Sequence, residues 1–170
     1  IGTSFVKIGL FDLEANPLKD YQIKFEHWMT IKSDGTYIFD AETSAELIER
    51  GLDELLNRAS NFEILAVSVD TMASTILGLD QNNNPITPVY TYADTRSYKE
   101  LSDLKSKINQ KKIYDETGCP MHTSCIPARI LWLRRTNSEL YKKVGLWTDF
   151  SNYLYRSCLL YTSDAADEVQ

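Results

Sequence analysis

The chain opens with IGTSFVKIGLFD, residues 1–12, a stretch that enters a β-strand almost at once. Residues 6–13 are rich in β-branched and aromatic side chains, which favour the pleated surface of a strand. A turn signal at residues 14–17 separates them from a second strand-like run over residues 18–31, so the pattern predicts a hairpin. A tight turn at Ser33 to Thr36 then leads to residues 37–39. The opening therefore predicts a three-stranded antiparallel meander.

A helix is predicted next, and a buried strand after it. The apolar positions of the helix recur at helical spacing as far as residue 59: Leu47, Ile48, Leu52, Leu55 and Leu56. Either Asp40 or Thr43 can cap its N-terminus. Residues 64–69, ILAVSV, follow as a near-continuous apolar run, which is typical of a parallel strand buried on both faces.

The second half of the chain contains two short strands and then helices. Residues 75–79 and 89–92 have strand character and flank a polar turn at residues 80–85. The pattern becomes helical after Arg96, with a break at residues 117–120. Further helices are predicted over residues 126–135, 139–143 and 150–155, and Pro127 suits a first helical turn. This order of elements predicts an α/β fold with a mixed sheet.

Composition narrows the class of protein. With 170 residues, 43% of them hydrophobic, the chain is long enough for one domain with a real core. No apolar run approaches the roughly 20 residues that cross a bilayer, so no membrane partner is expected. The net charge of −6, with scattered Lys and Arg, argues against a nucleic-acid partner. Three cysteines form no disulfide framework, and no leader opens the sequence, so we expect a cytoplasmic protein.

Both ends of the chain look truncated. Ile1 stands where a start methionine is expected, so we expect further sequence upstream. Residues 158–168 resemble a translated sequencing adapter, whereas the ordinary alternative is a frayed C-terminus. Without Asp164, Asp167 and Glu168 the acidic residues fall from 24 to 21 against 18 basic residues, so the acidic balance becomes weak.

The first candidate site is the turn at Gly2, Thr3 and Ser4, with Lys7 close behind. Glycine lets a phosphate approach the backbone closely, while exposed N–H groups and two hydroxyls can donate to its oxygens. The alternative is a plain strand start, since Gly-Thr-Ser occurs widely by chance.

The second candidate site is the stretch Tyr92 to Arg96, where a strand hands over to a helix. Ligands gather at strand ends in α/β sheets. Asp94 can accept hydrogen bonds from sugar hydroxyls, and Tyr92 can stack on the face of a sugar ring. The alternative is that Asp94 caps the following helix and pairs with Arg96 on the surface.

Cys119, His122 and Cys125 do not make a convincing metal or nucleophile site. A structural zinc site needs four ligands, and the only other histidine lies far away in the chain. We therefore expect no metal ligands. Trp132 and Trp147 lie in apolar stretches interpreted as helical and are most simply core residues.

The motifs, taken in order, resemble those of the FGGY carbohydrate kinases. They are residues 1–4, 67–80 with 85–88, 92–96, 117–119 and 130–133. The resemblance covers residues 1–156, the start of that family's N-terminal domain, and leaves 157–170 as a non-native tail. It implies the actin-like, ribonuclease H-like ATPase fold, incomplete here, with a cleft that holds sugar and MgATP.

The resemblance also implies site residues. Thr3, Ser4 and Lys7, with Gly2, match the family's phosphate-facing loop. Tyr92, Asp94 and Arg96 match its Trp-x-Asp-x-Arg motif, which lines the sugar pocket. Two further positions, Ala73 and Ser74, replace the Met-His pair of xylulose and gluconate kinases, so a hydroxyl stands where an imidazole would touch the substrate.

The implied activity is ATP-dependent phosphorylation of a sugar or sugar acid, with Mg²⁺ accompanying ATP. The family's catalytic Asp lies downstream of residue 156, so no catalytic residue is assigned in this chain and the chain alone is expected to be inactive. The expected partner is a small-molecule sugar or sugar acid, and a homodimer is kept as an option. The alternative function is a non-catalytic sugar-binding or partner-binding domain.

Overall fold

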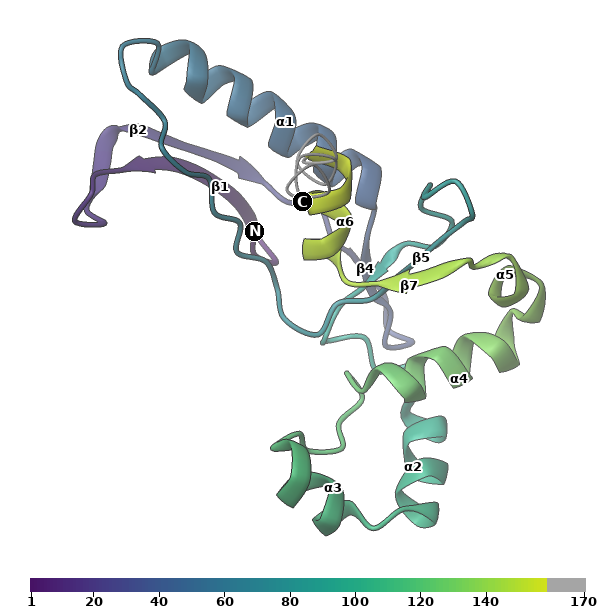
Figure 1. Cartoon of the computed structure of the whole chain (residues 1–170). Helices are drawn as coiled ribbons and strands as arrows, with labels where there is room; N and C mark the ends of the chain where they lie inside the picture. Colours follow the sequence, from purple (N-terminus) through teal and green to yellow (C-terminus); the bar gives the residue numbers. More distant parts are fainter. Residues whose placement is uncertain (159–170) are drawn as a thin grey trace, which may run out of the picture. The chain divides into compact units, whose positions relative to one another are not determined.

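The computed structural model describes residues 1–158 and divides into two compact units. The first unit contains residues 1–29, 40–72 and 151–158. The second contains residues 30–39 and 73–150. Figure 1 shows their elements along the chain.

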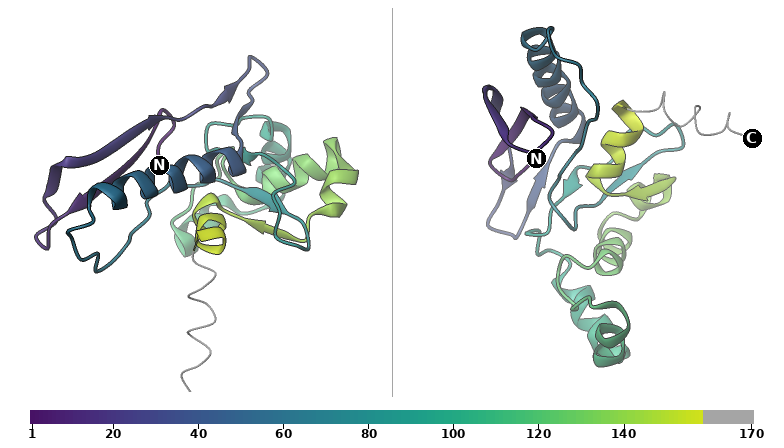
Figure 2. Two further views of the ribbon diagram at one scale, coloured as in Figure 1. Left: turned by 90° about the horizontal axis from the view of Figure 1, so that it is seen from above. Right: turned by 60° about the vertical axis from the view of Figure 1, so that its left-hand side comes forward.

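The first unit is built on a hairpin covered by a long helix. Strands β1 (Phe5–Phe11) and β2 (Pro17–Glu26) are antiparallel, with Val6 opposite Phe25. Helix α1 (Ala41–Arg58) lies along this hairpin (Figure 2). At Gly51 an added Cβ would lie 2.5 Å from the Ile8 side chain and 2.7 Å from the Phe25 ring, so glycine permits the close approach. Helix α6 (Phe150–Cys158) belongs mostly to this unit.

The predicted cap of α1 is confirmed at Asp40. Its carboxylate accepts a hydrogen bond from the Thr43 N–H at 2.8 Å, which satisfies one of the free donors of the first turn. The buried face of the helix includes Ile48 and Leu55, as the spacing predicts, whereas Leu56 is exposed. The hairpin and the helix therefore follow from local sequence signals.

The second unit contains two small antiparallel sheets. Strands β3 (Thr30–Ile31), β4 (Tyr37–Phe39) and β6 (Val89–Tyr90) form one, in that order. Strands β5 (Leu77–Leu79) and β7 (Leu146–Thr148) form the other. A bridge between Ile76 and Tyr90 joins the two sheets through hydrogen bonds of 3.0 and 2.8 Å. The core here centres on Ile76, Tyr90 and Leu133.

Four helices complete the second unit: α2 (Tyr98–Lys107), α3 (Gln110–Thr117), α4 (Ile126–Thr136) and α5 (Ser138–Lys143). Gly118 ends α3 in the left-handed conformation, as the predicted break requires. Helices α2 and α4 pack together and share an ion pair between Glu100 and Arg135. The predicted helices after Arg96 are confirmed.

The predicted three-stranded meander is corrected by the strand pairing. The hairpin forms, but β4 pairs with β3 and β6 and not with β1 or β2. The cause is that the predicted strand over residues 18–31 is interrupted: β2 ends at Glu26, and residues 27–29 carry the chain out of the ladder before β3. The third strand therefore builds a second sheet.

The predicted buried parallel strand over residues 64–69 is also wrong. This segment has no regular structure, and Leu65 and Val67 are 68% and 64% exposed. A strand needs a neighbour for its N–H and C=O groups, and no other segment of residues 1–158 forms a ladder with it. All the strand pairs among these residues are antiparallel, so the sheets described are not mixed.

Trp147 is a further correction, since it lies in strand β7 and not in a helix. No helix within residues 1–158 has the length and apolar character needed to span a bilayer. The predicted tail, residues 157–170, lies almost wholly outside the described residues.

Candidate functional site

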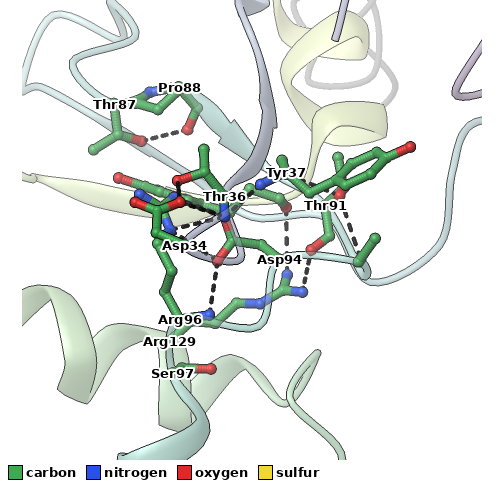
Figure 3. Close-up of polar contacts among 12 residues, drawn as sticks. Asp34, Thr36, Tyr37, Thr87, Pro88, Thr91, Asp94, Arg96, Ser97 and Arg129 are labelled. Atoms are coloured by element: carbon green, nitrogen blue, oxygen red, sulfur yellow. Dashed lines mark hydrogen bonds and ion pairs between the residues drawn. The ribbon is translucent and has the colours of Figure 1, made fainter. Parts of the chain in front are cut away.

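Asp94 is the centre of a buried polar corner in the second unit (Figure 3). Its side chain is only 3% exposed, yet its carboxylate accepts hydrogen bonds from the Tyr37 N–H at 3.1 Å and the Arg96 N–H at 3.2 Å. The Arg96 side chain adds three contacts, from Nε to each carboxylate oxygen at 3.1 Å and from Nη2 to one of them at 2.6 Å. A buried carboxylate is stable only with such partners, so the corner is locked by charge-assisted hydrogen bonds.

Arg96 is held on its other side by aromatic rings. Its guanidinium lies 4.5 Å from the centre of the Trp132 ring and 5.6 Å from that of Tyr90, within the range of cation–π attraction. The two rings pack edge to face at 5.7 Å. Burial raises the pKa of Tyr90 to about 12, so this phenol stays neutral beside the ion pair. Arg96 is thus fixed in orientation.

The turn between β3 and β4 packs against the same corner. Gly35 adopts a φ of 90°, and its carbonyl accepts a hydrogen bond from the Thr95 N–H at 3.0 Å. An added Cβ at Gly35 would overlap the Thr95 hydroxyl. The carboxylate of Asp34 accepts from the Thr36 hydroxyl at 2.6 Å and the Thr36 N–H at 3.0 Å, and these bonds lower its pKa. The positive φ and the contact with Thr95 therefore require a glycine at position 35.

Ala73 and Ser74 lie close to Tyr92 in the second unit. The antiparallel bridge between Ile76 and Tyr90 places the residues before Ile76 beside those after Tyr90. Ser74 is exposed and has a φ of 56°, which is unusual for a residue with a side chain. Tyr92 is 48% exposed. The second unit therefore brings the five predicted sugar-site residues to one neighbourhood.

Asp94 differs from its predicted alternative role as a helix cap. Helix α2 begins at Tyr98 with Ser97 in the N-cap position, so Asp94 does not cap it. The pair with Arg96 does form, with the Asp94 side chain buried at 3% exposure and the Arg96 side chain partly buried at 21%.

The turn at Gly2, Thr3 and Ser4 belongs to the first unit and is clamped by His27. The His27 N–H donates to the Ser4 carbonyl at 3.0 Å, and ring atom Nδ1 lies 2.7 Å from the Gly2 carbonyl. A carbonyl only accepts, so Nδ1 carries the proton. The N–H groups of Thr3 and Ser4 have no hydrogen-bond partner among residues 1–158, so they are available as donors.

His27 is itself held in the interior of the first unit. Its Nε2 lies 3.0 Å from the Ser44 hydroxyl of α1. Burial lowers the pKa of His27, against the hydrogen bond to Gly2, and the Ile1 ammonium lowers it further. Burial therefore favours a neutral imidazole, and the bond to Gly2 works against it.

Lys7 is the least constrained of the predicted phosphate ligands. It is exposed on β1, where its cross-strand neighbour is Lys24. Lys24 extends over the Phe5 ring at 3.5 Å, which leaves Lys7 as an exposed cation close to the turn in sequence.

The cysteine and histidine cluster remains a loop. Cys119 is exposed, and His122 contacts Ser124 at 3.1 Å. Across residues 1–158 no three His, Cys, Asp or Glu side chains converge in a way that could hold a metal ion.

Two anchors of the site were not predicted from sequence: His27 and Arg129. Arg129 contacts backbone carbonyls behind the Asp94 corner. One hint of Arg129 was present in the sequence: it is a charged residue on the apolar face of a predicted helix. Its neighbours Ala128 and Leu133 are core residues.

Solved structures of carbohydrate kinases have the same fold as this chain. The structure is similar to that of a xylulose kinase from Rhodospirillum rubrum, with a TM-score of 0.85 and 16% identity over 92% of this chain and 32% of that one. A gluconate kinase from Lactobacillus acidophilus gives a TM-score of 0.75 and 22% identity, covering 91% of this chain and 31% of the other. The fold is therefore the actin-like ATPase fold of carbohydrate kinases, as the sequence predicts.

The family follows from the sequence comparison. Residues 1–165 match the FGGY family of carbohydrate kinases, N-terminal domain, and the chain belongs to this family. An autoinducer-2 kinase from Escherichia coli (strain SMS-3-5 / SECEC) is 31% identical over 160 residues, which are 90% of this chain and 29% of that protein. A gluconokinase from Bacillus subtilis (strain 168) is 23% identical over 162 residues, 92% of this chain and 30% of that protein. The chain thus spans under a third of these relatives' length.

Proposed function

We propose that the whole protein transfers the γ-phosphoryl group of ATP to a hydroxyl of a sugar or sugar acid. The observation that carries this proposal is the ion pair of the buried Asp94 with the partly buried Arg96, beside the exposed Ser74 and Tyr92, in a chain of the FGGY family. Kinases of this kind depend on positioning and on electrostatic stabilisation of the phosphates, and this chain offers groups for both tasks.

The turn at Gly2, Thr3 and Ser4 is proposed to bind the phosphates of MgATP. Its support is the pair of unpartnered N–H groups at Thr3 and Ser4, two hydroxyls and a glycine without a Cβ. Successive backbone N–H groups form a concave anion site, and Lys7 adds a positive charge nearby in the chain. Magnesium would arrive with ATP and offset charge on the phosphate oxygens.

The corner around Asp94 is proposed to bind the sugar. Tyr92 offers half of its surface to a ring face, and Ser74 offers an exposed hydroxyl. Nη1 of Arg96 has no hydrogen-bond partner among residues 1–158, so it can donate to a hydroxyl or a carboxylate of the substrate. Asp94 then acts by holding Arg96, since both of its carboxylate oxygens already accept hydrogen bonds from Tyr37 and Arg96. Ala73, the small exposed residue beside Ser74, completes the set of proposed sugar-site residues.

No residue of this chain is assigned as the catalytic base. Our proposal places the base, an Asp, in the part of the whole protein that follows residue 156. There it would accept the proton of the attacking hydroxyl as the oxygen–phosphorus bond forms and ADP leaves. The chain alone is then expected to be inactive. We also propose that the whole protein is cytoplasmic. A homodimer is part of the same proposal, and light scattering of the whole protein measures its oligomeric state.

The test is a coupled ATPase assay of the whole protein with a panel of gluconate, xylulose and autoinducer-2, the substrates that the relatives' names suggest. We expect phosphorylation of at least one compound of this class. In Asp94→Ala the KM for that compound should rise about tenfold or more, since a charge-assisted contact is worth about 1.5–3 kcal/mol.

The matched control is Asp103→Ala, which removes an exposed acid of α2 and should leave the KM unchanged. An unchanged KM in Asp94→Ala would remove Asp94 from the sugar site. Sugar binding without phosphoryl transfer would favour the alternative, a non-catalytic binding domain.

A further inference from the structure

Arg129 is the largest fully buried side chain among the described residues, at 2% exposure. It lies in α4, and each of its hydrogen bonds goes to a backbone carbonyl. Nε donates to Thr123 at 3.3 Å, and Nη1 donates to Ser74 at 2.7 Å and to Tyr90 at 3.3 Å. Nη2 donates to the carbonyl of Thr91. No carboxylate is hydrogen-bonded to this cation among residues 1–158.

A buried cation of this kind is costly. Burial lowers the pKa of Arg129 to about 10, although the nearby Asp94 acts in the opposite direction. An apolar side chain of similar volume often stabilises a core as well as a buried ion does. The planar guanidinium, however, can donate to several fixed acceptors at once, which neither an apolar side chain nor lysine can do.

The four carbonyls belong to three segments that meet at the Asp94 corner. One is the turn of Ser74, whose left-handed φ of 56° needs support from its surroundings. The second is the end of β6 at Tyr90 and Thr91, directly before Tyr92. The third is Thr123, whose carbonyl also accepts from the Ser97 hydroxyl at 3.1 Å. Figure 3 shows the Arg129 guanidinium close to Thr91, with its hydrogen bonds as dashed lines.

We propose that Arg129 is a positioning residue for the sugar site, which holds the backbone of Ser74 and of the β6 end in register so that Ser74, Tyr92 and Asp94 face one ligand together. The expected change in the KM for the sugar rests on the proposed function. The expected ordering of the backbone at Ser74 and at the end of β6 rests only on the hydrogen bonds of Arg129.

The kinetic test uses the whole protein with the substrate that it phosphorylates best. Arg129→Met keeps the volume and removes the donors, so the KM for the sugar should rise about tenfold while the KM for ATP stays within about twofold. Arg129→Lys should recover part of the loss, because lysine keeps the charge and some donors. Arg134→Met, which changes an exposed arginine of the same helix, is the matched control and should behave as the wild type.

A sugar KM unchanged in Arg129→Met, or equal losses for sugar and ATP, would overturn the proposal. If Arg129→Met shows no cooperative unfolding transition, Arg129→Lys decides the matter by the same two KM values. In that case an unchanged sugar KM, or equal losses for sugar and ATP, in the lysine variant overturns the proposal.

Amide hydrogen exchange of the whole protein, followed by mass spectrometry, separates this proposal from the proposed function. In Arg129→Met, or in Arg129→Lys if the first does not fold, exchange should quicken at residues 74–76 and 90–96 but not in the β1–β2 hairpin. Uniform or unchanged exchange would overturn the positioning role even in an active kinase. Selective exchange in a protein that phosphorylates no sugar would refute only the proposed function.

Discussion

The turn at Gly2 to Ser4 and the corner at Asp94 are held by different forces. The turn is partly exposed, and it is held by the buried His27 through its ring and its backbone N–H, and by the hydrogen bond from the Gly2 N–H to the Phe5 carbonyl. The corner is buried, and charges from Arg96 and Arg129 fix it from both sides. The turn keeps free donors, whereas the corner keeps a fixed shape. This difference is consistent with the roles that we propose for them, phosphate binding at the turn and sugar binding at the corner.

The largest effect on stability should come from breaking the corner. Asp94→Ala removes the acceptor for Tyr37 and for Arg96, so the free energy of unfolding should fall by about 3 kcal/mol, as for other buried pairs that lose one partner. Urea denaturation of the 170-residue chain measures this change. Asp103→Ala serves as the exposed control, and a loss under about 1 kcal/mol for Asp94→Ala would show that the charges do not hold the corner.

A smaller loss is expected at the turn that packs on the corner. Gly35→Ala forces a side chain into a φ of 90° and against Thr95, which should cost about 2 kcal/mol. Gly118→Ala has a similar backbone requirement, with a φ of 69°, but no atom lies within 4 Å of the added Cβ. The difference between the two variants in urea denaturation isolates the contact with Thr95. Equal losses would mean that the turn does not press on the corner.

The smallest effect should appear at the His27 clamp, as a dependence on pH. Its pKa is lowered in the folded chain from the ordinary value of 6.5, so the unfolded chain binds more protons. The stabilisation is therefore complete above pH 6.5 and is lost as the pH falls through the lowered folded value, at no more than about 1.4 kcal/mol per pH unit.

The measurement is urea denaturation of the chain across this pH range. His27→Gln should flatten the profile, with His122→Gln as the control for removing a histidine. If the free energy of unfolding of His27→Gln depended on pH as that of the wild type does, the lowered pKa of His27 would be contradicted.

Local signals were enough to predict much of the fold. The hairpin, the Asp40 cap and the helices after Arg96 depend on neighbouring residues, and the structure confirms them. The segment 64–69 failed because an apolar run becomes a strand only when another strand pairs with it, and pairing is not a local property. Strand β7 was missed because its three residues give almost no periodic signal.

In the candidate site, too, local features could be predicted from the sequence and non-local ones could not. Tyr92, Asp94 and Arg96 were predicted because they form one short motif. Their supports come from far along the chain: Tyr37 is 57 residues from Asp94, and Arg129 is 55 residues from Ser74. Such supports follow from tertiary structure, so the sequence offers only indirect hints of them. The roles of all the site residues remain predictions.

The most direct measurement is a crystal structure of the whole protein with its best sugar and a non-hydrolysable ATP analogue. The account predicts sugar oxygens within about 3 Å of Ser74 or Arg96, with Tyr92 against the ring, and phosphate oxygens within about 3 Å of the Thr3 and Ser4 N–H groups. Sugar and phosphates bound away from both the turn and the corner would contradict it.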